Sequence, residues 1–134
     1  MKTIIKFLVG LIAAILLLIV GGAYLLPAEV RFSRSLEIKA PPDKVFAIVA
    51  DFDRFNEWSP WAALDPAARY SRSGPRQGAG AGLAWASNDA SVGKGSMTIT
   101  RHEPPSQLEL ALDFGDMGQS QSQWEFKPQA AGTL

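Results

Sequence analysis

The sequence predicts an α+β domain with a curved antiparallel sheet and two short helices, preceded by an N-terminal transmembrane helix. Three observations support this: an uncharged apolar run near the N-terminus, an aromatic-rich segment with helical spacing, and later stretches in which apolar and polar residues alternate. A chain of 134 residues has room for one such domain. We place the anchor at residues 1–27 and the domain at residues 28–134.

The N-terminal run covers residues 7–26 and contains no charged side chain. A helix of this length spans roughly 30 Å, which matches the hydrocarbon core of a bilayer. Lys2 and Lys6 precede the run, so the positive-inside rule favours a cytoplasmic N-terminus and an extracytoplasmic (periplasmic) domain. The residues expected within the membrane are Phe7, Leu11, Leu16, Leu17, Leu18, Val20 and Leu26.

A cleaved signal peptide is the alternative interpretation of the same run. Gly21 and Ala23 supply small residues where a signal peptidase would cut. The run is longer than a usual signal core of about 7–15 residues and continues past that point, which favours an uncleaved anchor.

Composition excludes several classes of function. The chain holds 13 basic and 13 acidic residues, and this balance argues against nucleic-acid binding, which needs a cationic excess. It has no Cys and one His, so disulfides, thiolate catalysis and clustered Cys or His metal ligands are excluded. We therefore predict no metal ion and no cofactor.

Three segments open the domain. Residues 30–40 alternate in polarity and predict a half-buried strand. Pro41, Pro42 and Asp43 then suit the first turn of a helix, which Val45, Phe46, Val49 and Phe52 continue at helical spacing. In residues 51–61, Phe55 and Trp58 share one face of a further helical turn, which Pro60 is expected to end.

The rest of the chain predicts strands at residues 68–73, 82–87, 93–102, 107–114 and 120–127. The short, turn-rich connections after residues 102 and 114 favour antiparallel neighbours. Their alternation gives one apolar face, formed by Met97, Ile99, Leu108, Leu110, Leu112, Phe114, Trp124 and Phe126.

No catalytic residue is predicted. His102 lies at a strand end beside a Pro-Pro turn and has no partner motif, so we expect it to be solvated or to cap the turn. Asp51, Asp53 and Glu57 are interpreted as solvated helix ends rather than as an acid–base pair.

Residues 38–61, IKAPPDKVFAIVADFDRFNEWSPW, resemble the opening of the SRPBCC superfamily, which includes START-like, Bet v 1-like and polyketide cyclase/dehydrase proteins. The matching positions are Ala40, Pro41, Asp51, Phe55, Trp58 and Trp61. The resemblance implies a helix-grip fold, in which a curved sheet wraps a long C-terminal helix with an apolar cavity between them.

The family pattern would continue past Leu134 with a last strand and the C-terminal helix, so we expect the domain to be incomplete. Without that helix, the apolar face from Leu108 to Phe126 is expected to stay uncovered and to promote self-association.

The resemblance favours a membrane-anchored domain that binds a hydrophobic small molecule or lipid. The residues expected to line its cavity are Phe55, Trp58, Trp61, Trp85, Met97, Ile99, Leu110, Leu112 and Trp124. Two alternatives are a cyclase- or dehydrase-like enzyme acting on a polyketide and a non-catalytic module that binds another envelope protein.

Overall fold

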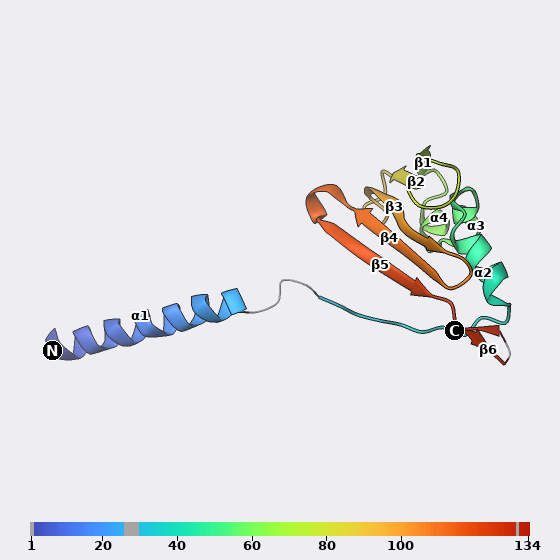
Figure 1. Cartoon of the computed structure of the whole chain (residues 1–134). Coiled ribbons are helices and arrows are strands. Elements are labelled where there is room, and N and C mark those ends of the chain that lie inside the picture. Colours follow the sequence, from blue (N-terminus) through green and yellow to red (C-terminus); the bar gives the residue numbers. More distant parts are fainter. Residues whose placement is uncertain (1, 26–29, 131) are drawn as a thin grey trace. The chain divides into compact units, whose positions relative to one another are not determined.

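A computed structural model describes residues 2–25, 30–130 and 132–134 of the chain (Figure 1). It divides into two compact units, Met1–Arg34 and Ser35–Leu134, which are described separately.

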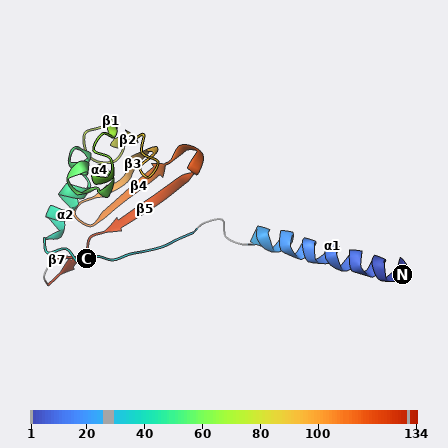
Figure 2. The same cartoon turned by 180° about the vertical axis from the view of Figure 1, so that it is seen from behind.

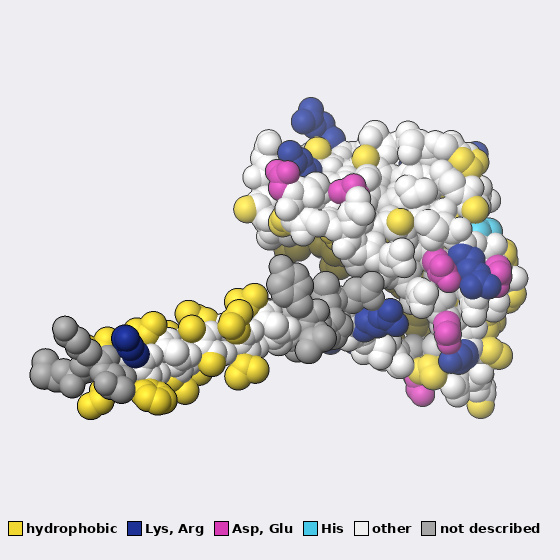
Figure 3. Space-filling view, turned by 60° about the vertical axis from the view of Figure 1, so that its left-hand side comes forward, with side chains coloured by type: hydrophobic (Ala, Val, Ile, Leu, Met, Phe, Trp, Pro, Cys, Tyr) yellow, Lys and Arg dark blue, Asp and Glu magenta, His cyan; other side chains and the backbone are white. Residues whose placement is uncertain are grey.

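The first unit contains helix α1 (Lys2–Leu25). Its stretch Ile4–Gly22 is long and apolar enough to cross a membrane, a test that an N-terminal signal sequence also passes. Hydrophobic side chains line the visible face of α1 (Figure 3), and they are exposed along the helix. Leu26 lies outside the described residues, and the other predicted membrane-spanning residues are all exposed: Phe7, Leu11, Leu16, Leu17, Leu18 and Val20.

The second unit opens with four short helical segments: α2 (Pro42–Val49), the 3₁₀ turn η1 (Phe52–Arg54), α3 (Phe55–Trp58) and α4 (Pro60–Leu64). Helix α2 begins with proline at its first position, as predicted. The second predicted helix, α3, ends before Pro60 as expected, but Pro60 also starts a further helix, α4, that was not predicted.

Five antiparallel strands follow in the order β1-β2-β3-β4-β5, which is also their order in the chain. Their bounds are β1 (Arg69–Ser73), β2 (Gly82–Ala86), β3 (Lys94–Glu103), β4 (Gln107–Asp113) and β5 (Gln119–Glu125). The turn η2 (Gly115–Met117) joins β4 to β5, and β6 (Pro128–Gln129) pairs with β7 (Gly132–Thr133). All five strands of the sheet were predicted, and alternation is clearest in β4.

The short helices of the second unit pack on one face of the sheet, which we call the inner face (Figures 1 and 2). Ile99 and Leu108 are completely buried at its centre, and Phe46 of α2 meets Phe126 edge to face at 5.4 Å. Full burial of one such apolar side chain stabilises the fold by about 1.5–3 kcal/mol. This packing fixes the helices against the sheet.

The expectation that the inner face stays uncovered is wrong for its central part. Leu108, Leu110 and Phe126 are buried, whereas Leu112, Phe114 and Trp124 are half-buried. The reason is that the segment from α2 to α3 places Phe46, Phe52 and Phe55 over this face and so supplies the cover.

The predicted strand at residues 30–40 is also wrong. Val30 and Phe32 are about nine-tenths exposed, and the segment joins a ladder only where Ile38 exchanges backbone hydrogen bonds with Thr133. Alternating polarity describes the side chains, but a strand also needs a neighbouring backbone with which to pair. Residues 30–37 have no such neighbour within the described part of the chain.

Candidate functional site

The pairing register places the predicted sheet residues on the inner face. Residues directly opposite each other in an antiparallel pair project from the same face. Leu83 pairs with Met97, Met97 with Leu112, and Ile99 with Leu110. Toward one edge of the sheet, Trp85 of β2 lies opposite Tyr70 of β1. Toward the other edge, Leu108 of β4 lies opposite Trp124 of β5.

Helices α3 and α4 add aromatic rings to one side of this face. The Phe55 ring meets Trp58 edge to face at 5.2 Å and stacks on Trp61 at 6.4 Å. It also lies 6.1 Å from Tyr70 of β1, and Trp58 meets Trp124 of β5 at the same distance. We call these five residues the aromatic cluster: Phe55, Trp58, Trp61, Tyr70 and Trp124.

All nine predicted ligand-binding residues therefore lie on the inner face or in its helical cover, but they differ in exposure. Trp61 is 45% exposed and is the most accessible of them. The half-buried members are Trp58, Trp85, Leu112 and Trp124, and the buried ones are Phe55, Met97, Ile99 and Leu110. The arrangement gives an apolar floor beneath partly accessible rings.

The aromatic cluster and the adjacent Ser59 carry polar atoms that are buried without a partner. The indole nitrogens of Trp58 and Trp124, the Tyr70 hydroxyl and the Ser59 hydroxyl have no hydrogen bond to any described residue. Nearly all buried polar groups in folded proteins are paired, so four exceptions around one cluster require an explanation. Tyr70 and Ser59 were not among the predicted site residues, since the polar strand RYSRS gives no periodic signal that assigns Tyr70 a face.

Tyr70 remains a hydrogen-bond donor at neutral pH. Burial raises the pKa of its phenol, and the nearby Asp65 carboxylate raises that pKa further. Asp65 itself is engaged, because it accepts hydrogen bonds from the Ala67 backbone and the Ser87 hydroxyl. The neutral phenol therefore has no acceptor of its own among the described residues.

Trp85 differs from the other tryptophans of the face. Its indole N–H donates to the Val92 carbonyl at 3.3 Å, and its ring meets Phe114 edge to face at 5.9 Å. A Cβ on Gly95 would come within 2.5 Å of the ring, so the indole packs directly on this glycine. The Trp85 ring is thus held by packing and its N–H is paired, although Trp85 lies opposite Tyr70 of the cluster.

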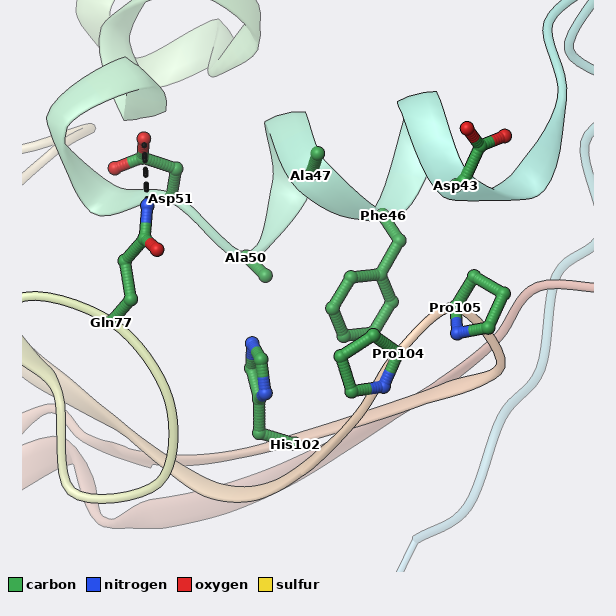
Figure 4. Close-up of a pocket in the computed structure, with 9 residues that line it drawn as sticks. All are labelled: Asp43, Phe46, Ala47, Ala50, Asp51, Gln77, His102, Pro104 and Pro105. Carbon is green, nitrogen blue, oxygen red and sulfur yellow. Dashed lines mark hydrogen bonds between the residues drawn. The ribbon is translucent and has the colours of Figure 1, made fainter.

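A separate groove lies between α2 and the β3–β4 turn and has a volume of about 370 Å³ (Figure 4). Pockets for small molecules commonly measure roughly 300–1,000 Å³. Apolar side chains of α2 and the turn form much of the groove, and Gln77 donates to Asp51 across one side at 3.5 Å. Its lining residues are Asp43, Phe46, Ala47, Ala50, Asp51, Gln77, His102, Pro104 and Pro105.

His102 reaches this groove because of an irregularity in β3. The pairing with β4 shifts between Ile99 and Arg101, so His102 lies opposite the buried Leu108. A bulge of this kind changes the face to which the following side chains project. The imidazole packs edge to face on Phe46 at 5.1 Å and lines the groove, contrary to the expected solvated or turn-capping position. No sequence signal marks the bulge.

None of the nine predicted ligand-binding residues lines that groove. Trp124 alone of the nine contributes to a second hollow of about 170 Å³, which the charged outer side chains of β3, β4 and β5 surround. There Arg101 is paired with both Glu103 and Glu109. The paired charges make this hollow a poor match for an apolar ligand.

The family of the chain is decided by comparison with known protein families. Residues 29–134 match the model of the family described as "Polyketide cyclase / dehydrase and lipid transport". The chain belongs to this family. The match covers the whole domain after the N-terminal helix, and the resemblance inferred from residues 38–61 is confirmed. Comparisons with curated proteins and with solved structures find no match.

Proposed function

We propose that this member of the polyketide cyclase/dehydrase and lipid transport family is a membrane-anchored domain that binds a hydrophobic small molecule or lipid. One observation supports this most directly. Nine apolar or aromatic residues from α3, α4, β2, β3, β4 and β5 gather on the inner face and its cover, where Trp61 and Leu112 remain partly accessible. Convergent aromatic side chains of this kind line ligand pockets in many proteins.

Ligand binding is tested with the full-length chain in detergent, by native mass spectrometry against a panel of single-chain lipids, phospholipids and aromatic polyketides. We expect at least one class to bind with a defined stoichiometry. Trp61→Ala should weaken that binding, because Trp61 is the accessible ring of the cluster. Leu36→Ala is the control, since Leu36 is also an exposed apolar side chain, at 73% exposure, but lies outside the cluster. An absence of binding across the whole panel would refute the proposal.

The proposed anchor is α1, and its apolar stretch Ile4–Gly22 supports this. Leu16→Lys combined with Leu17→Lys places two charges near the middle of the helix, at a cost of about 2.5–3.5 kcal/mol each in the membrane. We expect the variant to leave the membrane fraction on carbonate extraction while the parent chain stays. The control variant Leu64→Lys, at an exposed site of α4, should stay in the membrane fraction as the parent chain does. Intact mass of the membrane-bound chain then decides between an anchor and a signal cleaved near Ala23.

The proposed orientation places the domain outside the cytoplasm. Because the chain has no Cys, Ser91→Cys creates a single thiol at an exposed position of the domain. In intact cells a membrane-impermeant maleimide should label this thiol. Labelling only after lysis would reverse the proposed topology.

A second candidate function is favoured by the groove beside α2. Imidazole both accepts and donates protons near neutral pH, and here it shares an apolar-walled groove with Asp51 and Asp43. A cyclase- or dehydrase-type reaction on a polyketide would use His102 for proton transfer. His102→Gln should then abolish turnover by the full chain while the fold remains, and unchanged turnover would eliminate this candidate.

A further inference from the structure

The unpaired donors of the aromatic cluster restrict what the ligand must carry. Leaving a buried polar group unsatisfied destabilises a fold, and four such groups lie around this one cluster. The indole N–H groups of Trp58 and Trp124 can only donate, and the protonated Tyr70 hydroxyl can donate as well. The ligand therefore has to provide acceptor oxygen atoms.

The charges around the cluster distinguish a neutral acceptor from an anionic one. The guanidinium of Arg54 is held by Glu57 at 2.7 Å, and Arg72 is paired with Asp53. Arg69 precedes Tyr70 on β1, so alternation sends its side chain to the opposite face of the sheet. The carboxylate that influences Tyr70 is Asp65, which would repel an anion. None of these described side chains offers a carboxylate ligand a free counter-charge, so its desolvation would be penalised, whereas a neutral carbonyl would not suffer that penalty.

We propose that the aromatic cluster recognises a neutral carbonyl oxygen on its hydrophobic ligand, as in an ester, through the N–H groups of Trp58 and Trp124 and the Tyr70 hydroxyl. This inference rests on the proposed function and narrows it. The ligand is an apolar chain with an uncharged ester group, in preference to a free acid or a plain hydrocarbon.

The test compares three probes of similar chain length: methyl palmitate, palmitic acid and hexadecane. Binding of each to the full-length chain is measured by native mass spectrometry at a pH where the acid is ionised. We expect methyl palmitate to bind about tenfold or more tightly than hexadecane, since two or more hydrogen bonds of ordinary strength are gained. Palmitate should bind more weakly than the ester.

The variants Trp58→Phe and Trp124→Phe keep an aromatic ring and remove the donor. Each should reduce the preference for ester over hydrocarbon about fivefold, and the double variant should reduce it further, to what the Tyr70 hydroxyl alone supplies. Trp85→Phe is the matched control, because the Trp85 N–H already has an acceptor in Val92. Whatever it does to affinity, it should change binding of all three probes by the same factor.

A measurement on the unaltered chain covers the case in which the variants misfold. With ¹⁵N-labelled indoles, the Trp58 and Trp124 N–H resonances should shift on addition of methyl palmitate and stay in place with hexadecane. Equal affinity for ester and hydrocarbon, or tighter binding of palmitate, would overturn the inference while hydrophobic binding stands. Failure of all three probes to bind would overturn the inference and contradict the proposed function together.

Discussion

The two halves of the inner face pack similar apolar residues but treat polar groups differently. In the half under α2, Phe46, Ile99, Leu108 and Phe126 bury hydrocarbon against hydrocarbon, and both Ile99 and Leu108 are sealed completely. In the half under α3 and α4, the rings of the aromatic cluster bring N–H and O–H groups out of water without supplying acceptors from the described residues. The first half is organised as an apolar core, whereas the second buries polar groups that no described residue pairs.

The difference shows why burial alone does not separate a packed interior from a binding site. Apolar side chains gain by losing contact with water in either case. Polar atoms distinguish a packed interior from a binding site, because an unpaired buried donor is disfavoured unless a group from outside the chain accepts its hydrogen bond. The tryptophans are informative for this reason, since each combines a large apolar ring with one obligatory donor.

The largest expected effect on stability comes from a substitution in the half under α2. Leu108→Ala should lower the free energy of unfolding by about 2–5 kcal/mol, because the side chain is fully buried and its removal leaves a cavity. Urea denaturation of the full chain in detergent, followed by far-UV circular dichroism, measures this. Leu36→Ala, at a site 73% exposed, should change stability by no more than about 0.5 kcal/mol. A small effect at Leu108 would mean that this half is loosely packed.

The substitution Gly95→Ala tests whether the Trp85 ring is packed as tightly as the half under α2 or is free to move. Gly95→Ala places a methyl group 2.5 Å from the indole and 2.7 Å from the Asp113 carbonyl, so ring and backbone must both move. We expect a loss of about 1–3 kcal/mol, as for overpacking of a core.

Ser96→Ala, one residue along β3, is the control for Gly95→Ala, because strand alternation places Ser96 on the opposite face. If Gly95→Ala were tolerated as well as Ser96→Ala, the Trp85 ring would be free to move, and it would then group with the aromatic cluster.

In the half under α3 and α4, substitution of a half-buried tryptophan should lower the free energy of unfolding much less than Leu108→Ala does. Without ligand, Trp58→Phe and Trp124→Phe each remove an unpaired buried donor, so the gain offsets part of the lost ring area. We expect each to alter the free energy of unfolding by within about 1 kcal/mol. Trp85→Phe should be more destabilising, because it breaks the bond to Val92. Equal losses at all three tryptophans would remove the distinction between the two halves.

The sequence predicted the sheet best where its strands alternate cleanly, as in β4. The residues of β4, QLELALD, could bury one face only as a strand, and Val45 and Phe46 marked the buried side of α2. The strand predicted at residues 30–40 failed because pairing partners are a property of the whole fold. The candidate site residues were chosen by residue type, and the unpaired donors among them were not predicted, since hydrogen-bond partners depend on three-dimensional neighbours. The position of His102 in the groove was not predicted, because a bulge, which alternation does not encode, decides its face.

The smallest expected effect concerns Tyr70 at alkaline pH. Burial and Asp65 raise the pKa of its phenol, so the folded state disfavours the phenolate that the unfolded chain forms near pH 10. The unfolded state therefore loses its proton first, and stability falls as pH rises from about 10 toward the higher folded-state pKa.

Tyr70→Phe removes this dependence, so the variant should lose less thermal stability than the parent between neutral pH and pH values above about 10. Parallel melting curves across that range measure the difference. Identical slopes would place the Tyr70 hydroxyl in water and take it out of the aromatic cluster, leaving the two indoles as its donors.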